Sequence, residues 1–371
     1  MSNYIFRRHY LAAASLLFAA LIGLGAIHSQ AILSTKENNP HLPGLSNDTT
    51  GQNKITIDTG VELKNFQAVV VDSSNTKWFV TEQGIVSYNG AKWTLHNKNR
   101  KVTTQDLKGF AYEINPNGHE LWIASPKGAT VASLPIDGRT GATTYHTGNT
   151  TILSNNVCQV AIGKSPMRWI GTDKGVSAFK NDKWLTPAYD ELYPADMFRE
   201  FRITSMATSR DGDSLYVGTE GAGIARVYRN DVDAISGASV YAQWGPIILP
   251  SDKIYSTFIA ADGTQWFGTD KGIARHTGNL TLTSWKVFTV KDGLADNFVQ
   301  AITADQTGKI WIGTKKGISV FDGVSWNTFV MDETKNSNNI RCIAVDKTGV
   351  IWFGTDNGVI SYENGDFTGY R

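Results

Sequence analysis

Three aspartates occupy the same place in a repeated pattern, and carboxylates at fixed spacing are candidates for general acid–base catalysis. Asp72, Asp305 and Asp346 each stand just before a predicted turn. An aspartate in that place can accept hydrogen bonds from the backbone N–H groups of its own turn. We therefore expect these carboxylates to cap turns, and we do not predict a catalytic pair from them.

Other patterns that carry chemistry are missing from the sequence. It has no His-Glu-x-x-His, no Gly-x-Ser-x-Gly, no phosphate-binding glycine loop and no clustered Cys/His spacing. The seven histidines are scattered, and His146 or His276 as a general base is only a weak hypothesis. The sequence thus predicts no catalytic residue, no metal site and no cofactor, while enzymatic activity stays an open alternative.

A short aromatic pattern recurs along the chain and defines the elements that would position a site. It is Trp-(Ile/Phe)-Gly-Thr, followed two residues later by Gly. Four copies are strong and begin at Trp169, Trp266, Trp311 and Trp352. Three weaker copies begin at Trp78, Trp122 and Tyr216. The anchors lie 41 to 50 residues apart, and self-similarity at such a period is typical of a blade-by-blade array.

One repeat predicts four short strands with turns between them. Around Trp311 these strands are 298–304, 309–314, 318–321 and 325–329. Side chains alternate along a strand, so Trp311 and Gly313 share one face, and the bulk of a neighbouring sheet can fill the space above the glycine. We therefore interpret the anchor aromatics as core residues. A second aromatic recurs in the fourth strand, at Trp93, Trp184, Trp285, Trp326 and Phe367.

Seven such units predict an all-β fold, a seven-bladed β-propeller of four-stranded antiparallel blades over residues 55–371, preceded by one N-terminal apolar helix. Residues 54–59 are a candidate extra strand that pairs with the last blade and helps to close the ring. Cys158 and Cys342 fall in inner strands of distant blades, so we expect two buried thiols and no disulfide.

The pattern Asp-x-x-Gly-x-(Ile/Leu)-Trp-(Ile/Phe)-Gly-Thr-x-x-Gly-(Ile/Val) resembles the two-component regulator propeller repeat. Residues 305–318 and 346–359 match it at nearly every position. The resemblance implies the periplasmic sensor part of a membrane-spanning hybrid histidine kinase, often one that binds glycan fragments. No kinase or receiver domain follows the propeller in this sequence, so we expect the recognition part alone, acting with a separate membrane signalling protein.

The N-terminal residues carry an export pattern. Arg7 and Arg8 precede an apolar run over residues 11–27, and small residues follow it. We expect residues 1–31 to be a signal peptide, of ordinary or twin-arginine type, or an uncleaved membrane anchor. Residues 32–54 predict a flexible linker. The protein would then be exported, and either periplasmic or anchored to the inner membrane. A net charge of +1 with no basic patch argues against a nucleic acid partner.

Two links between predicted blades are longer than the repeat requires, and long loops on a rigid scaffold often carry function. These are residues 185–202 and 229–253. Their aromatic and basic side chains could line one mouth of the central channel and suit a sugar ring or a peptide, although they could equally pack the loops down. The candidate ligand-binding residues in these links are Tyr189, Tyr193, Arg199, Arg202, Tyr241 and Trp244.

A second candidate set comes from aligning the innermost strands. One equivalent position holds Gln67, Lys108, Cys158, Thr204, Tyr255, Gln300 and Arg341. We select Lys108, Tyr255, Gln300 and Arg341 as candidate ligand contacts, and the two basic residues hint at an acidic ligand. We thus predict a non-catalytic recognition propeller for a glycan fragment or a protein. The alternatives are a polysaccharide lyase or hydrolase of the cell envelope, and a structural scaffold. The oligomeric state stays open.

Overall fold

A computed structural model describes residues 62–96, 102, 106–115, 118–137, 141–163, 167–180, 183–185, 201–210, 212, 214–229, 235–241, 249–278, 284–331 and 338–370. All of them belong to the unit His41–Arg371. The predicted apolar helix, the linker and the candidate strand at residues 54–59 lie outside these ranges. Within them, no helix is long and apolar enough to cross a bilayer.

The described strands form seven four-stranded antiparallel sheets, and each sheet uses four consecutive strands. Blade one is β1 Ala68–Val71, β2 Lys77–Thr81, β3 Gly84–Tyr88 and β4 Trp93–His96. Blade two is β5 Gly109–Asn115, β6 Gly118–Ser125, β7 Gly128–Ser133 and β8 Ala142–Tyr145. Blade three is β9 Val157–Ile162, β10 Arg168–Thr172, β11 Gly175–Lys180 and β12 Lys183–Leu185. Blade four is β13 Ile203–Thr208, β14 Ser214–Thr219, β15 Ile224–Arg229 and β16 Ile235–Tyr241.

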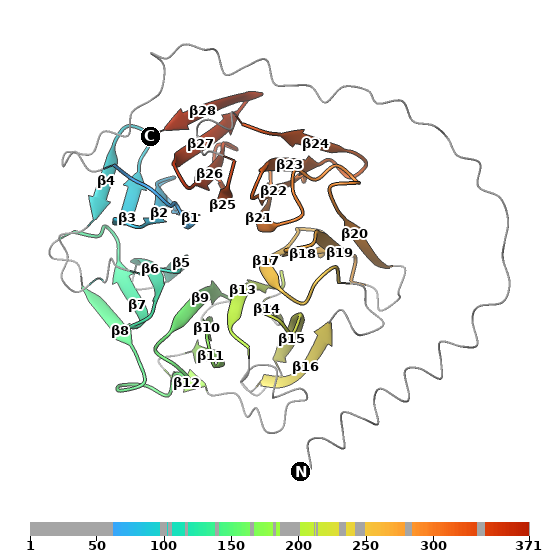
Figure 1. The fold of residues 1–371 in the computed structure, drawn as a ribbon. Coiled ribbons are helices and arrows are strands. Elements are labelled where there is room, and N and C mark those ends of the chain that lie inside the picture. The colour runs from blue at the N-terminus through green and yellow to red at the C-terminus, as the bar shows by residue number, and fades with distance from the viewer. Residues whose placement is uncertain are drawn as a thin grey trace, which may run out of the picture. The chain divides into compact units, whose positions relative to one another are not determined.

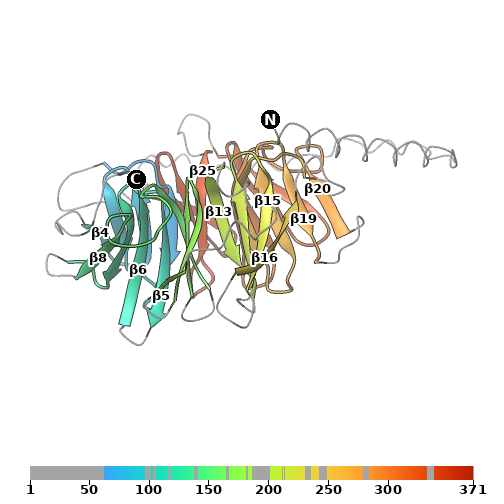
Figure 2. The same cartoon turned by 90° about the horizontal axis from the view of Figure 1, so that it is seen from below.

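The remaining three blades complete the ring. Blade five is β17 Ile254–Ile259, β18 Gln265–Thr269, β19 Ile273–His276 and β20 Trp285–Phe288. Blade six is β21 Val299–Ala304, β22 Ile310–Thr314, β23 Gly317–Phe321 and β24 Trp326–Phe329. Blade seven is β25 Ile340–Val345, β26 Ile351–Thr355, β27 Gly358–Glu363 and β28 Asp366–Tyr370. The first strand of every blade lies nearest the centre (Figure 1), and the strands run from one face of the propeller to the other (Figure 2). The predicted all-β seven-bladed propeller is therefore confirmed.

The anchor aromatics pack between blades, next to a glycine that the neighbouring blade approaches closely. All seven anchors are buried. A Cβ atom on Gly313 would lie 2.6 Å from Cγ2 of Ile340, in the next blade's inner strand, and one on Gly171 would lie 2.7 Å from Cγ2 of Ile203. Real Cβ atoms do not come that close, so glycine is required where the radial sheets meet. Trp311 joins the same hydrophobic cluster as Ile340, as the alternation of its strand predicted.

The second aromatic of the repeat faces a partner across the hairpin of the third and fourth strands. Trp93 stacks on Tyr88 with ring centroids 4.6 Å apart, and Trp285 stacks on His276 at 4.3 Å. Phe321 and Trp326 form the same cross-strand pair at 4.9 Å. These pairs hold the outer strands of blades one, five and six through side-chain contact as well as through ladder hydrogen bonds.

The repeat aspartates do cap turns, and they also fix the anchor indoles. In blade seven, Oδ1 of Asp346 accepts hydrogen bonds from the backbone N–H groups of Thr348 and Val350 at 2.9 and 3.1 Å. Its Oδ2 accepts the indole N–H of Trp352 at 3.0 Å. Asp305 and Asp72 make the corresponding bonds to Trp311 and Trp78, each at 2.9 Å. The carboxylates predicted as turn caps are therefore structural.

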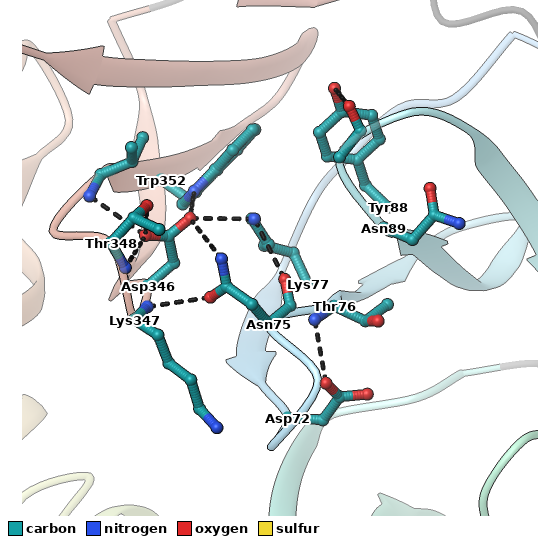
Figure 3. Close-up of polar contacts among 12 residues, drawn as sticks. Asp72, Asn75, Thr76, Lys77, Tyr88, Asn89, Asp346, Lys347, Thr348 and Trp352 are labelled. Carbon is teal, nitrogen blue, oxygen red and sulfur yellow. Dashed lines mark hydrogen bonds and ion pairs between the residues drawn. The ribbon is translucent and has the colours of Figure 1, made fainter.

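Blades one and seven close the ring through a buried ion pair (Figure 3). Nζ of Lys77 lies 2.9 Å from Oδ2 of Asp346, and the two side chains are only 5% and 2% exposed. The same ammonium donates to the backbone carbonyl of Asn75 at 3.1 Å and lies 4.9 Å from the ring of Trp352. Burial alone would raise the pKa of Asp346. Hydrogen bonds from Thr348, Lys77 and Trp352 outweigh burial and hold that pKa at about 2.

Both cysteines are free and buried, as predicted. Cys342 also takes part in ring closure, since its Sγ lies 3.4 Å from the backbone carbonyl oxygen of Phe66 in the first blade. Burial raises the pKa of the Cys342 thiol to about 12. Burial also raises the pKa of Cys158, although the nearby Arg202 opposes that rise.

Candidate functional site

The hairpin between the second and third strands and the link that enters each blade share one face of the propeller. The backbone N–H of Glu82 donates to the carbonyl of Lys64 at 3.3 Å, and that of Glu220 donates to the carbonyl of Arg202 at 3.0 Å. Lys315 repeats this bond with the carbonyl of Phe298 at 3.2 Å. In blades four and six the first residue of the hairpin meets the residue just before the inner strand, and in blade one it meets a residue four positions before β1.

In five blades the predicted inner-strand residues stand at β-bulges. In blade five, Ile254 pairs with Thr269 and Ser256 pairs with Gly268, so Tyr255 is the extra residue. A bulge re-aims the side chain of its extra residue. The same shift in register singles out Gln300 and Arg341 in blades six and seven. Cys158 and Thr204 hold this position in blades three and four.

A hydrogen bond between an amide and a carboxylate crosses from the link to the hairpin in several blades. Nδ2 of Asn156 donates to Oδ2 of Asp173 at 3.1 Å in blade three, and Asn65 donates to Glu82 in blade one. In blade seven, Nδ2 of Asn339 donates to Oδ2 of Asp356 at 2.7 Å. These pairs hold the hairpin against the start of the inner strand and leave the carboxylates at one mouth of the channel.

Blade seven adds the predicted Arg341 to this pair. Its guanidinium Nε donates to Oδ1 of Asp356, so both oxygens of that carboxylate are occupied. The neighbouring Gln300 reaches across the joint, where its Nε2 donates to Oδ1 of Asn339 at 2.6 Å and to the carbonyl of Ile340 at 3.0 Å. The structure thus brings Gln300 and Arg341 into one hydrogen-bonded group that spans blades six and seven.

Blades five and six present aromatic rings at the same mouth. The centroids of Tyr255 and Phe298 lie 4.4 Å apart, with their planes at 42°. Phe298 stands where other blades place an asparagine, and Lys315 stands where they place a carboxylate. Nζ of Lys315 lies 3.8 Å from the centroid of Phe298. Blade six therefore replaces the amide–carboxylate bond by a contact between a cation and an aromatic ring.

Blades three and four bring a thiol and a guanidinium together. Nε of Arg202 lies 3.2 Å from Sγ of Cys158. The pKa of Arg202 is raised, chiefly by its hydrogen bond to the Cys158 thiol and less by the negative charges of Glu220 and Asp173. The guanidinium therefore stays charged. Lys108 lies near enough to favour the ionised form of Cys158. Burial of Cys158 nevertheless outweighs its cationic neighbours, so this thiol is not an activated nucleophile.

The predicted ligand residues thus fall into two groups. Tyr255, Gln300 and Arg341 are bulge residues of the inner strands, Arg202 contacts the bulge residue Cys158, and Lys108 directly precedes β5. Tyr189, Tyr193, Arg199 and Trp244 lie outside the described residues, and Tyr241 ends strand β16, whose side chains are not described.

The sequence analysis selected none of the carboxylates at the first position of the hairpins as a ligand contact. They are Glu82, Asp173, Glu220, Asp270 and Asp356. Their constant offset from the anchor aromatic could have identified them, including the two glutamates in weaker copies of the repeat. With five carboxylates at this mouth, the hint of an acidic ligand loses its basis.

The described histidines take part in contacts elsewhere. His276 pairs with Gln265 at 2.8 Å, and His96 bonds to Ser87 at 2.8 Å. His119 lies near the turn between the first and second strands of blade two, 2.7 Å from the hydroxyl of Tyr112. In the part of the chain that the structure describes, no three His, Cys, Asp or Glu side chains gather as a metal ion would need.

Comparison with known families supports the repeat assignment. The profile of the two-component regulator propeller matches residues 293–316 and 334–357, which contain the first two strands of blades six and seven. The chain carries two-component regulator propeller repeats. The two matched segments overlap the copies at 305–318 and 346–359 that follow the family pattern most completely. No curated protein sequence matches the chain.

Solved structures share the fold of this repeat propeller at low identity. The extracellular domain of BT3049, classed as a hybrid two-component system of B. thetaiotaomicron, is 19% identical with a TM-score of 0.65, and the match covers 81% of this chain. This chain spans only 40% of that domain. Virginiamycin B lyase from Staphylococcus aureus is 14% identical with a TM-score of 0.58, and the match covers 81% of this chain and 96% of the lyase.

A third propeller, YCF48 bound to D1 peptide, is 12% identical with a TM-score of 0.56, and the match covers 82% of this chain and 94% of YCF48. The extracellular domain of a two-component system, a lyase and a peptide-bound protein therefore share this architecture. At such identities the likeness shows the fold alone, so a function has to be argued from the site.

Proposed function

We propose that this protein is an exported sensor-type propeller that binds a glycan fragment or a segment of a partner protein at the mouth formed by the hairpins and the bulge residues. The observation that carries the proposal is the set of hydrogen-bonding and aromatic side chains at corresponding bulge positions, among them Tyr255, Gln300 and Arg341. Propellers bind ligands at such channel mouths because loops and inner strands converge there.

The repeats support a role in recognition. The name of BT3049 places a propeller of this kind in the extracellular part of a two-component system. By analogy, this chain would report its ligand to a separate membrane signalling protein from the periplasm, either free or held at the inner membrane by its N-terminal segment. It would recognise its ligand without doing chemistry on it.

A glycan array and a pull-down with the full chain test the proposal. We expect a ligand in at least one of the two screens, and we expect its binding to weaken in Tyr255→Ala and Gln300→Ala. His119→Ala, at the opposite ends of the strands, is the matched control. Two empty screens would contradict the proposal. Breakdown of a bound polysaccharide would favour the alternative of an envelope lyase or hydrolase, and binding only through an apolar outer surface would favour a scaffold.

A further inference from the structure

Among the described residues, the hairpin carboxylate of blade five, Asp270, lacks the hydrogen-bond donor that the corresponding Asp356 has in blade seven. In blade seven, Asp356 receives a guanidinium from Arg341 and an amide from Asn339. Blade five keeps the carboxylate, as Asp270, but has Tyr255 in the place of the arginine. Oδ1 of Asp270 is buried and has no hydrogen-bond partner within the described part of the chain. A buried acceptor without a donor is costly, so a donor that reached this oxygen would bind favourably.

The aromatic corner beside Asp270 already holds a positive charge. Tyr255 and Phe298 are half-buried and meet at an angle of 42°, with centroids 4.4 Å apart. The ammonium of Lys315, an exposed residue, rests 3.8 Å from the centroid of Phe298. The face of an aromatic ring carries negative charge density. The contact with Lys315 therefore shows that the face of Phe298 suits a cation.

Two carboxylates act on the same corner. Burial raises the pKa of the Tyr255 hydroxyl, and the negative charges of Asp270 and Glu220 raise it further. Both carboxylates therefore lie close enough to Tyr255 to influence a charge placed beside its ring. Glu220 is exposed, and its backbone bridges to Lys253 at the entry to blade five. An aromatic face flanked by carboxylates suits a guanidinium or an ammonium group.

We infer that the mouth over blades five and six recognises an arginine or lysine side chain of a peptide partner, with Asp270 as its counter-ion and Tyr255 and Phe298 as its aromatic contacts. The inference rests on the proposed function and names the ligand chemistry of the same site. In the structure the ammonium of Lys315 lies over the face of Phe298. The cation of the partner displaces Lys315 and takes the place that the guanidinium of Arg341 holds in blade seven.

Calorimetric titration of the full chain tests this inference with three peptides of equal length, tri-arginine, tri-glutamate and tri-glycine, and with a chitosan trimer. We expect only tri-arginine to bind, and we expect its affinity to fall with rising salt. Because the protein has a net charge of only +1, attraction of a cationic peptide by the whole chain cannot produce this selectivity. Tyr255→Leu should weaken binding about 2- to 30-fold, and Asp270→Asn by at least about tenfold.

Lys315 supplies a test in the opposite direction. Lys315→Ala should strengthen tri-arginine binding several-fold, because it removes the internal competitor. Lys316→Ala is the matched control, since Lys316 is exposed and pairs with Asp296 at 3.4 Å. A melting curve of each variant should match that of the wild type, so that changes in binding are not changes in folding.

Four outcomes overturn the inference. Tri-arginine fails to bind, tri-glutamate or the chitosan trimer binds in preference to it, its affinity is unchanged in both Tyr255→Leu and Asp270→Asn, or Lys315→Ala weakens it. If the peptides fail while a glycan or a protein binds in a manner that needs Gln300, the proposed function stands and only this inference falls.

Discussion

Replacing Lys77 by methionine should destabilise the propeller at the joint between its first and last blades. The ammonium of Lys77 lies 2.9 Å from Oδ2 of Asp346, and both side chains are almost fully buried. Removing one partner of a buried ion pair leaves an uncompensated charge, which typically costs about 3–5 kcal/mol. Asp346 keeps its hydrogen bonds from Thr348, Val350 and Trp352. We therefore expect the free energy of unfolding to fall by about 3 kcal/mol, at the lower end of that range.

The assay is thermal and urea unfolding followed by tryptophan fluorescence. At roughly 2–4 °C for each kcal/mol in a large domain, the loss corresponds to a fall in Tm of about 6–12 °C. Lys316→Met is the matched control, because its ion pair with Asp296 is 3.4 Å long and its side chain is 75% exposed. An exposed pair contributes at most about 1 kcal/mol. Equal melting of Lys77→Met and the wild type, or an equal loss in both variants, would refute the reasoning.

Acid titration gives a second readout of the same joint. The pKa of Asp346 is about 2 in the folded protein, against 3.8 ordinarily. A carboxyl group with a depressed pKa stabilises the folded state at any pH above its ordinary pKa. This contribution, of about 2 kcal/mol, is lost as the pH falls through about 2. Wild-type stability should therefore decline between about pH 4 and pH 2. The decline should be shallower in Lys77→Met, and an unchanged profile would show that Lys77 does not stabilise the carboxylate.

Three further predictions concern other parts of the fold. Gly313→Val should lower stability by about 1–3 kcal/mol in urea unfolding, because a Cβ there would lie 2.6 Å from Ile340. Wild-type stability in this assay would contradict the close approach of Ile340 to the glycine. Gly163→Asp should raise stability by about 1 kcal/mol. The indole N–H of Trp169 is buried without an acceptor in the described structure. In blades one, six and seven an aspartate six residues before the tryptophan accepts this hydrogen bond. Gly163→Ala, which adds the Cβ alone, should not stabilise the protein, and equal effects of the two changes would argue against the hydrogen bond. Cys342 should resist alkylation by iodoacetamide at pH 8 in the native protein, since burial raises its pKa to about 12; labelling as fast as in urea, measured by mass spectrometry, would show that the first and last blades separate readily.

The sequence predicted those features that repeat within one blade. The anchor of WIGTKKG, the glycine beside it and the capping Asp305 recur at constant offsets, so a single blade was enough to infer their roles. Alternation placed Trp311 and Gly313 on one face without knowledge of the neighbour. The bulge position aligned as well, because the candidate residue stands 11 residues before the anchor in five of the seven copies.

Contacts that depend on one particular pair of blades could not be predicted in this way. Lys77 directly precedes the anchor of blade one, and the corresponding residue in blade seven is the apolar Ile351. The repeat therefore does not predict a buried lysine there, and its contact with Asp346 is visible only when the first and last blades are seen side by side. Similarly, Phe298 and Lys315 replace an amide and a carboxylate together, and the exchange is visible only once link and hairpin are seen to touch. The aromatic residues of the two long links remain predictions.

Every sheet uses four consecutive strands, and this has a consequence for how such a protein can change over evolutionary time. No blade borrows a strand from the far end of the chain in the described part of the structure, so duplication or loss of one complete unit would leave all the other sheets intact. The obstacle lies in Lys77 and Asp346, which meet only because the first blade lies beside the last one. An eighth unit inserted between the last and the first blade would leave both charges buried without a partner. New units would therefore be tolerated more easily between blades whose facing residues are uncharged.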